Sequence, residues 1–244
     1  MEFEIKRETL VKHIFSPIGK ITDSCELVFS GNKIHATAYH RPSNTVLCVE
    51  CESLCENVGT ICIGDVNRLV NIINSGNDDE ATIRLKVIDN YLLYETSSLK
   101  FKYHLKDSSF CDKTPLSKAR MDSLEFDVNF DFSIEDLTSI LQANSFVPTT
   151  NKFYFYMKDK KIHVDITDYE TPNMDYYTLV FDRGVSTQFE KPFGINMSSV
   201  RHLAGSQMKN YKGYMRLNTK IGYFCYNIIG KDFNIKTMSA RVSK

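Results

Sequence analysis

The stretch FDVNFDFSIEDLTSILQ, from Phe126 to Gln142, joins a strand pattern directly to a helix pattern and decides the fold. Phe126, Val128 and Phe130 alternate with polar residues, as in a half-buried strand, and apolar residues then recur at helical spacing. Ser133 stands between the two patterns, where its side chain can accept from the unpaired amides of a first helical turn. The stretch therefore predicts a strand that runs straight into an amphipathic helix.

The same strand-then-helix pattern occurs three more times along the chain. Short alternating strands at Phe3, Ile61 and Phe193 precede the amphipathic stretches RETLVKHIF (7–15), GDVNRLVNIINSG (64–76) and SSVRHLAGSQM (198–208). Besides Ser133, the expected helix starts are Asp65 and Ser198 or Ser199, and the expected helix ends are Pro17, Gly76, Pro148 and Gly213.

Each predicted helix is followed by a hairpin and then by a third strand. The turns are expected at Gly31-Asn32, Asp89-Asn90, Asp159-Lys160 and Asn218-Thr219, residue pairs that tolerate the positive φ of tight turns. The third strands are TVLCVEC (45–51), LKFKYHL (99–105), YYTLVFD (176–182) and FNIKTMS (233–239). The chain is thus a fourfold repeat of a β-α-β-β-β unit.

Two such units are expected to form each domain, because a sheet with a single amphipathic helix needs a partner to cover its apolar face. The stretch KDSSFCDKTPLSKARMD (106–122) breaks the strand pattern with serine, proline and mixed charge, which is typical of a connector. We therefore predict an α+β fold with an N-terminal domain at 1–106, a connector at 107–122 and a C-terminal domain at 123–244.

Charge and composition limit the classes of function. Lysine plus arginine (30) balances aspartate plus glutamate (30), so any DNA contact must come from local charge segregation. The start of the chain lacks the apolar run of a signal peptide, and no stretch approaches the length of a membrane span. We expect a soluble, cytoplasmic protein. Its seven cysteines are expected to be reduced core residues without disulfides.

The sequence offers no convincing metal or catalytic site. Cys48 and Cys51, with Cys55 nearby, have the spacing of half a zinc site, but the second pair is missing and their odd spacing on a strand points them to opposite faces. Phosphate-binding loops, dinucleotide fingerprints and nucleophile elbows are absent. The acidic groups 78–80 and 165–170 are typical of solvated turns. We expect no enzyme activity, no metal and no cofactor.

The doubled repeat, the connector and the chain length together resemble a subunit of the trimeric DNA sliding clamps, the group that includes proliferating cell nuclear antigen and the T-even bacteriophage clamps. The resemblance covers the whole chain, and FSIEDLTSILQ (132–142), KFYFYMKDKKIHVDI (152–166) and FGINMSSVRHLAG (193–205) look closest to the phage branch. It implies a closed homotrimer of six domains around duplex DNA, with helices inside the ring and sheets outside. It also implies a processivity factor that binds DNA without sequence specificity, tethers a DNA polymerase and is placed on DNA by a clamp loader.

The resemblance implies three sets of site residues. The DNA-binding set on or beside the helices is Lys6, Arg7, Lys12, His13, Arg68, Arg201, His202, Lys209 and Lys212. The third helix departs from this pattern because Glu135 and Asp136 make it neutral to acidic. The pocket for partner peptides, at the connector and the last strand, is Phe110, Pro115, Leu116, Ile235 and Met238. The subunit interface, on one edge strand of each domain, is Leu99, Phe101, Tyr103, Leu105, Tyr177, Leu179 and Phe181.

Two alternatives of other classes stay open at this point. A monomeric polymerase accessory protein of similar fold would hold DNA by charge and would need a stronger basic face. A structural or adaptor protein, for example of a virus particle, would have no role with nucleic acid. The mass in solution separates a trimer from both.

Overall fold

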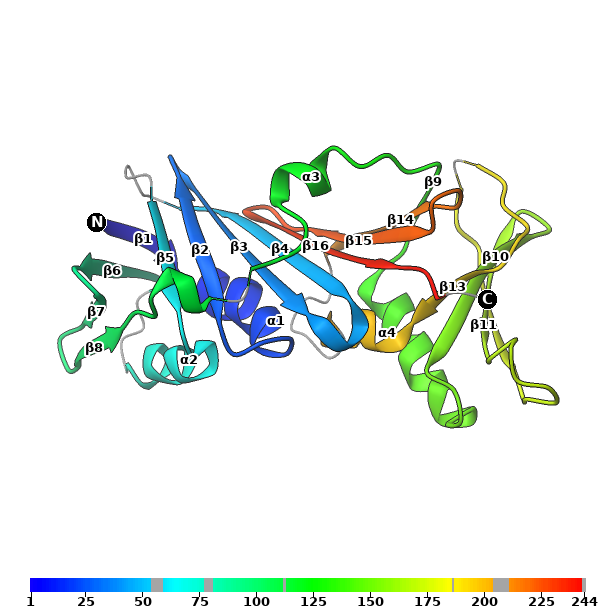
Figure 1. Cartoon of the computed structure of the whole chain (residues 1–244), viewed down its shortest axis with the longest axis horizontal. Coiled ribbons are helices and arrows are strands. Elements are labelled where there is room, and N and C mark those ends of the chain that lie inside the picture. The colour runs from blue at the N-terminus through cyan, green and yellow to red at the C-terminus, as the bar shows by residue number, and fades with distance from the viewer. Residues whose placement is uncertain (54–58, 77–80, 112, 186, 204–210, 243–244) are drawn as a thin grey trace. The chain divides into compact units, whose positions relative to one another are not determined.

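The computed structural model describes residues 1–244 except 54–58, 77–80, 112, 186, 204–210 and 243–244 (Figure 1). The chain forms two compact units, and each is described by itself. Unit 1 comprises Met1–His40, Val46–Lys118 and Gly230–Ile235. Unit 2 comprises Arg41–Thr45, Ala119–Ile229 and Lys236–Lys244.

Unit 1 contains two runs of hydrogen-bonded strands. The first has the order β1 (Glu2–Lys6), β6 (Thr82–Ile88), β7 (Tyr91–Glu95), β8 (Lys100–His104). The second has the order β5 (Gly59–Ile63), β2 (Cys25–Ser30), β3 (Lys33–His40), β4 (Thr45–Glu52). Phe3 lies opposite Leu85 in the first run and Leu27 lies opposite Ile61 in the second, so buried side chains face one another across the pairs.

Unit 2 repeats this plan. One sheet has the order β12 (Tyr177–Phe181), β11 (Lys161–Ile166), β10 (Lys152–Lys158), β13 (Phe193–Asn196). The other run is β16 (Phe233–Ala240), β15 (Tyr223–Ile229), β14 (Lys212–Asn218), β9 (Val128–Asp131). The strands expected from the sequence are therefore present in both units, and the mixed helix and strand content agrees with the predicted α+β class.

The first strand of every repeat leaves its own repeat and pairs with the neighbouring one. In unit 1, β1 pairs with β6 of the second repeat, and β5 of the second repeat pairs with β2 of the first. In unit 2, β9 pairs with β14 and β13 pairs with β10. Each unit is consequently held together by two exchanged strands, which the sequence pattern alone did not predict.

The helices follow the expected positions with two corrections. Helix α2 (Val66–Ser75) is capped by Asp65, which accepts from the Arg68 amide at 2.8 Å, and α4 (Ile134–Ala143) begins with a capping box between Ser133 and Asp136. The first helix is wrongly predicted to end at Pro17. A π-helical segment (η1, Thr9–Phe15) continues directly into α1 (Ser16–Gly19), and Pro17 lies in the first turn of α1.

The fourth helix is shorter in the described residues than the sequence predicts. Two 3₁₀ turns, η5 (Met197–Ser199) and η6 (Arg201–Leu203), follow β13, and the rest of the predicted helix lies outside the described residues. Asn196 caps η5 in place of the expected serines by accepting from the Ser198 amide at 3.0 Å. Three further short elements are η2 (Arg41–Ser43), α3 (Lys118–Asp122) and η4 (Asn144–Phe146).

Three of the four predicted hairpin turns are confirmed. Gly31, Asp89, Asp159 and Lys160 all have positive φ between 49° and 64°. The fourth turn is wrongly placed at Asn218-Thr219, because β14 extends through Asn218 and the chain reverses over residues 219–222. Gly222, with φ at 89°, supplies the left-handed conformation there.

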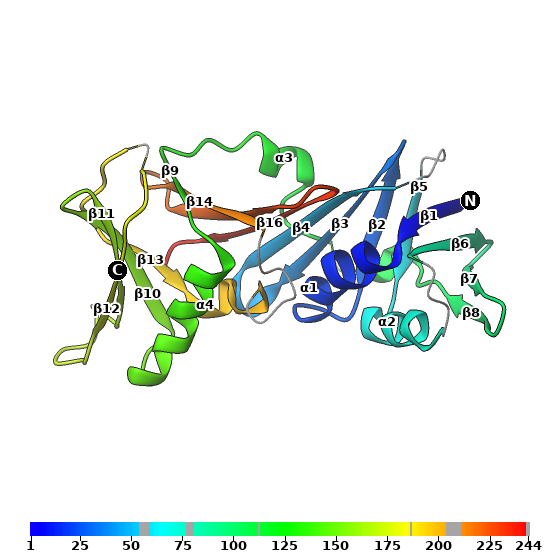
Figure 2. The same cartoon turned by 180° about the vertical axis from the view of Figure 1, so that it is seen from behind.

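Arg7 closes the carboxyl end of α2 inside unit 1. Its guanidinium donates from Nη1 to the carbonyl oxygens of Ile73 at 3.1 Å and Gly76 at 3.0 Å, and from Nη2 to the Tyr94 hydroxyl at 3.1 Å. The last carbonyls of a helix lack partners within the helix, and a cation there also favours the helix dipole. Arg7 thus ties β1 to α2. The helices α1 and α2 lie side by side in both views (Figure 2), joined by an Asn67 side-chain bond to the Gly19 carbonyl at 3.3 Å.

Replacing Gly213 with alanine tests the strand exchange in unit 2. A Cβ at Gly213 would lie 2.2 Å from the Phe132 carbonyl oxygen, which cannot retreat without breaking its bond from the Tyr226 hydroxyl at 3.0 Å. We expect Gly213→Ala to lower the free energy of unfolding by about 1–3 kcal/mol in urea titration. The control is Gly184→Ala, whose Cβ meets nothing within 4 Å. Equal stability of the two variants would contradict this packing.

Replacing Arg7 with alanine tests its role as a helix cap. The variant leaves the carbonyls of Ile73 and Gly76 without their charged donor, so we expect the free energy of unfolding to fall by about 2 kcal/mol. Arg84→Ala is the matched control, because Arg84 makes only exposed ion pairs with Glu2 and Glu4 and its loss should cost at most about 0.5–1 kcal/mol. A loss for Arg7→Ala no larger than that of the control would show that Arg7 does not cap α2.

Candidate DNA-facing helices and partner-binding segments

The outward face of α2 is polar and carries little charge. Val66, Leu69 and Ile73 are buried and fix the helix to the core of unit 1. The exposed face presents asparagine and serine side chains, and Arg68 is the single charged residue of the helix. Such a face can touch phosphate groups without reading bases and without holding them tightly.

Four of the predicted DNA-binding residues present a free or partly free positive charge at the surface. Lys12 keeps 41% of its side chain exposed and pairs with Glu8 at 2.9 Å. Arg68, Arg201 and Lys212 are exposed, and the Arg68 guanidinium lies 6.0 Å from the centroid of the Phe101 ring. Lys6 is exposed but forms an ion pair with Asp232, which offsets its charge. Lys209 lies outside the described residues.

Three of the predicted DNA-binding residues have structural positions instead, and we remove them from the proposed DNA-facing set. Arg7 caps α2, as described above. His13 is 4% exposed and stacks on Phe233 with ring centroids 3.9 Å apart, and burial lowers its pKa, so the ring carries no charge at pH 7. His202 is 7% exposed and its Nε2 lies 3.0 Å from the Thr237 hydroxyl. Helical spacing in the sequence does not distinguish such buried positions from exposed ones.

The acidic character of α4 is partly neutralised within unit 2. Asp136 is buried at the start of the helix, and Arg183 donates to both of its oxygens at 2.8–3.3 Å. Glu135 remains exposed on the same turn. The pair with Arg183 explains how this helix carries two adjacent carboxylates, and no sequence pattern pointed to Arg183 as the partner.

The connector begins with a short 3₁₀ turn, η3 (Ser108–Phe110), that is capped locally. Asp107 Oδ1 accepts from the Ser109 amide at 2.8 Å and from its hydroxyl at 2.6 Å, and these hydrogen bonds lower the pKa of Asp107. The turn leaves Phe110 70% exposed. An aromatic side chain this open on a connector is available for contact with another protein.

The predicted peptide pocket divides into exposed and buried members. Phe110 and Pro115 are exposed and Leu116 is half-buried. Ile235 and Met238 on β16 are 0% and 4% exposed, so they belong to the core and we remove them from the proposed contact surface. They are three positions apart on β16 and therefore on opposite faces, and the strand is buried on both faces around residues 237–239, which hydrophobicity alone did not show.

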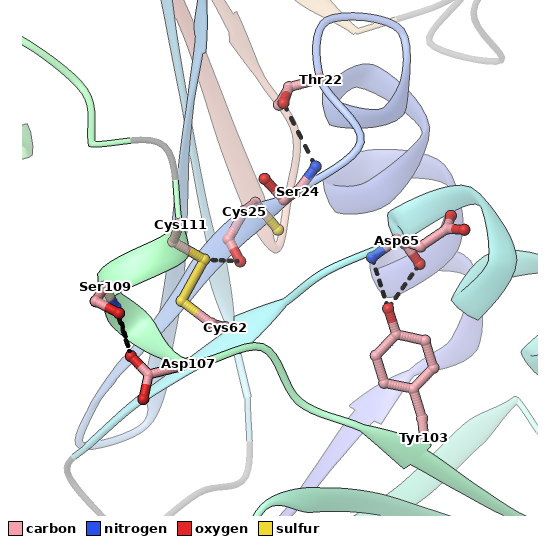
Figure 3. Close-up of a disulfide and its surroundings, with 9 residues drawn as sticks. All are labelled: Thr22, Ser24, Cys25, Cys62, Asp65, Tyr103, Asp107, Ser109 and Cys111. Carbon is pink, nitrogen blue, oxygen red and sulfur yellow. Dashed lines mark hydrogen bonds between the residues drawn. A yellow bond between two sulfur atoms is a disulfide. The ribbon is translucent and has the colours of Figure 1, made fainter.

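A disulfide joins the connector to β5, which corrects the expectation that every cysteine is a free thiol. Cys62 and Cys111 are bonded, with Cα atoms 6.4 Å apart, and both are buried (Figure 3). The pairing closes a loop of about 50 residues, which in the chain-entropy account stabilises the fold by about 4 kcal/mol. Cys62 lies in a core strand and Cys111 in a polar segment 49 positions later, so the sequence held no sign of the pairing.

Strand β8 forms one edge of the sheet in unit 1. Tyr103 points inward, where its hydroxyl donates to the Asp65 carbonyl at 3.0 Å, while Leu99, Phe101 and Leu105 are half-buried. Lys100, Lys102 and His104 line the exposed side. This edge is therefore apolar on one face and basic on the other.

Strand β12 forms one edge of the sheet in unit 2. Phe181 points inward against Phe132 at 5.4 Å, Leu179 is half-buried, and Tyr177 stacks on Phe146 at 5.1 Å. Phe146, Tyr176 and Val180 are exposed by 67%, 72% and 52%. Tyr176 and Val180 lie in the predicted interface strand but were not among its named residues, and Phe146 was not predicted at all. Strand alternation already places Val180 on the face opposite Leu179.

The part of the chain that the structure describes contains no group of three or more histidine, cysteine, aspartate or glutamate side chains able to hold a metal ion. Cys48 and Cys51 are buried and belong to no disulfide, and burial raises the pKa of Cys51 to about 12, which opposes the thiolate that a zinc site requires. Cys55 lies outside the described residues. Among the described residues, no helix has the length and apolar character needed to cross a membrane.

Comparison with known protein families, curated proteins and solved structures shows which known fold the chain has. No family model matches the sequence, and no curated protein matches it. Among solved structures, A. fulgidus PCNA bound to the C-terminal region of FEN-1 aligns with a TM-score of 0.78 and 15% identity over 100% of this chain and 98% of that one. Proliferating Cellular Nuclear Antigen from Entamoeba histolytica aligns with a TM-score of 0.77 and 13% identity over 99% and 98%.

A longer bacterial clamp also aligns. The DNA polymerase III subunit beta from Pseudomonas aeruginosa matches with a TM-score of 0.72 and 15% identity, covering 100% of this chain and 65% of that one. The paired β-α-β-β-β units, the connector and these full-length alignments agree with one another, and they confirm the α+β architecture predicted from the repeat. The chain has the fold of the DNA sliding clamps.

Proposed function

We propose that this chain is a sliding clamp, a DNA polymerase processivity factor that encircles duplex DNA as a closed homotrimer and tethers the polymerase and other replication proteins. The proposal is supported above all by the alignment of the whole chain with PCNA structures at TM-scores of 0.77–0.78. In this proposal the chain has domains at 1–106 and 123–244, joined by the connector at 107–122. In this proposal the chain binds duplex DNA and replication proteins and uses no catalytic residue, metal or cofactor.

The number of subunits follows from the number of repeats. A ring of six domains needs three copies of a chain that has two. Each copy would present one edge strand to each neighbour, and such head-to-tail contacts form a closed ring when the rotation between copies is 120°. A closed ring also removes the unpaired strand edges that otherwise invite aggregation.

The exposed edges support contact between copies. β8 carries Lys100, Lys102 and His104, whereas the exposed residues Asp175 and Asp182 flank β12, so the two edges differ in charge. Val180 on β12 and Tyr176 just before it are unusually exposed for large apolar side chains of a monomer. We therefore remove Tyr103 and Phe181, which point inward, from the proposed interface set. We add Phe146, Tyr176 and Val180 to its remaining members, Leu99, Phe101, Leu105, Tyr177 and Leu179.

The sparse charge of the helices favours a ring over a protein that holds DNA by attraction. Among the described residues of the predicted DNA-facing set, only Lys12, Arg68 and Arg201 on or beside the helices and Lys212 at the start of β14 remain exposed without a strong ion pair, and the formal net charge of the chain is zero. A monomeric accessory protein would need many phosphate contacts to stay bound at physiological salt. A ring needs only to surround the duplex, so weak and non-specific contacts are sufficient and permit sliding.

The proposed partners are proteins of DNA replication. The A. fulgidus clamp binds the C-terminal region of FEN-1, and we propose that this chain likewise accepts terminal peptides of a polymerase and of a clamp loader beside Phe110, Pro115 and Leu116. The exposed Phe110 supplies apolar area for such a contact. The site of action would be the cytoplasm, or the cytoplasm of the host if the protein comes from a bacteriophage.

The mass in solution tests the homotrimer. We expect light scattering to give three times 28.1 kDa for the native protein, because edge-strand pairing buries apolar surface at three equivalent contacts. Val180→Glu should shift the protein toward 28.1 kDa by placing a charge in the contact. Ile221→Glu is the matched control, since Ile221 is 76% exposed on a turn of the other strand run and should not affect assembly. A native mass of 28.1 kDa would contradict the homotrimer.

Retention on circular DNA tests encirclement. A trimer assembled in the presence of nicked circular DNA should remain with the circle during gel filtration at moderate salt and should leave once the circle is linearised. The reason is that a closed ring can escape only over a free end. Equal loss from circular and linear DNA as salt rises would favour the monomeric accessory protein.

A charge variant separates DNA contact from assembly in the same assay. Arg68→Glu combined with Arg201→Glu should reduce the amount of clamp captured on the circle by several-fold while leaving the trimer mass unchanged. Arg84→Glu serves as the control for general loss of positive charge, because Arg84 lies on β6 away from the helices. If the variant lost its trimer, the proposed positions of Arg68 and Arg201 would be wrong.

A further inference from the structure

Two side-chain interactions, a disulfide at Cys111 and an ion pair at Lys118, link the connector to strands of unit 1. The first is the Cys62–Cys111 disulfide, which joins the residue after η3 to strand β5 (Figure 3). The second is an ion pair at 3.0 Å between Lys118 and Glu50 on β4. The exposed contact residues Phe110 and Pro115 lie at or between these two points.

The Lys118–Glu50 ion pair is weaker than the Cys62–Cys111 disulfide. Glu50 and Lys118 keep 25% and 30% of their side chains exposed, and Lys33 also binds Glu50 at 3.2 Å, so the ion pair is partly solvated and shared. The disulfide is covalent and buried. Among the described residues, a backbone hydrogen bond from the Lys106 amide to the Cys62 carbonyl at 3.0 Å adds to these two links. The disulfide is therefore the stronger of the two side-chain links that hold the connector to unit 1.

The burial of the neighbouring Cys25 thiol favours oxidation of Cys62 with Cys111 over other pairings. Cys111 Sγ lies 3.9 Å from the Cys25 carbonyl oxygen, but Cys25 lies in the core strand β2, and burial raises the pKa of its thiol to about 12. A thiol kept protonated in this way exchanges slowly with a disulfide. Cys111 is within a short surface turn between Asp107 and the exposed connector, so local opening can bring its sulfur to solvent.

We propose that Cys62 and Cys111 form a reversible redox clip that holds the connector against β5 when oxidised and releases residues 107–117 when reduced. With a small-molecule disulfide such as oxidised glutathione, the Cys111 thiolate displaces one glutathione thiol and forms a mixed disulfide. The Cys62 thiolate then displaces the second, so that two cysteine thiols and one glutathione disulfide become one protein disulfide and two glutathione thiols. Any consequence for partner peptides rests on the proposed function, but the clip itself does not.

Hydrogen exchange of the full-length protein at defined ratios of oxidised to reduced glutathione tests the clip. Differential alkylation followed by peptide mapping gives the fraction of Cys62–Cys111 disulfide at each ratio. We expect peptides spanning 107–117 to exchange at least about tenfold faster in the reduced protein, while peptides of β2 and β3 are unchanged. This comparison needs no substitution, so a variant that fails to fold does not prevent the test.

Two variants sharpen the result. Cys111→Ala should exchange like the reduced wild type at every glutathione ratio and should lower Tm by about 5–10 °C relative to the oxidised wild type. Cys51→Ala, at a free buried cysteine of β4, should keep the full redox response. If Cys111→Ala still responded to glutathione, another cysteine would be responsible and the clip would be disproved.

Two other outcomes would also overturn the clip. One is alkylation of both Cys62 and Cys111 as free thiols after exposure to oxidised glutathione. The other is a disulfide whose reduction leaves exchange at 107–117 unchanged, which would make the bond a structural link only. Light scattering on the same samples keeps the two proposals apart, since a monomer with a working clip would refute the homotrimer and leave the clip intact.

Discussion

The exchange of first strands between repeats is the constraint on which each unit depends. β1 completes the sheet that begins with β6, and β5 completes the run that begins with β2, so neither repeat can satisfy its strand edges or cover its helix alone. The exchange also places η1 directly after β1 and α2 directly after β5, which brings the two helices together. The same arrangement of β9 and β13 in unit 2 makes the doubled repeat, rather than the single one, the smallest stable element.

Local features of this architecture were predictable from the sequence because they depend on neighbouring residues. The capping box at Ser133, the cap at Asp65 and the positive-φ turns at Gly31 and Asp89 each involve residues within three positions of one another. Features that depend on distant residues were not predictable. The strand exchange joins positions 30 or more residues apart, and the Asp136 pair with Arg183 and the disulfide join positions 47 and 49 residues apart. Periodicity carries no information about such partners.

The candidate site also divides into features that neighbouring residues determine, which the sequence predicted, and features that distant residues determine, which it did not. The sequence placed basic residues on helices, but it could not show that Arg7 turns inward to cap α2 while Arg68 remains on the surface. Both lie in amphipathic stretches, and tertiary contacts decide their directions, since Arg7 reaches the carbonyl oxygens of Ile73 and Gly76 at the end of α2. His13 was misjudged for a related reason, since a histidine next to Lys12 looks exposed until Phe233, from the far end of the sequence, covers its ring. The surviving positive residues are therefore few.

The small number of exposed positive residues and the exposed connector together suggest how the proposed clamp could combine mobility on DNA with selectivity for its protein partners. In the proposed clamp, weak helix contacts would leave sliding unhindered, because each phosphate interaction would cost little to break. Selectivity must then reside where the chain offers exposed apolar surface on a positioned segment, and Phe110 is the clearest example. A covalent bond one residue away, between Cys111 and β5, fixes that segment more firmly than the ion pair of Lys118 and Glu50 can. Affinity for partners would thus depend on how well the connector is held in place, because a segment ordered in advance loses less entropy on binding.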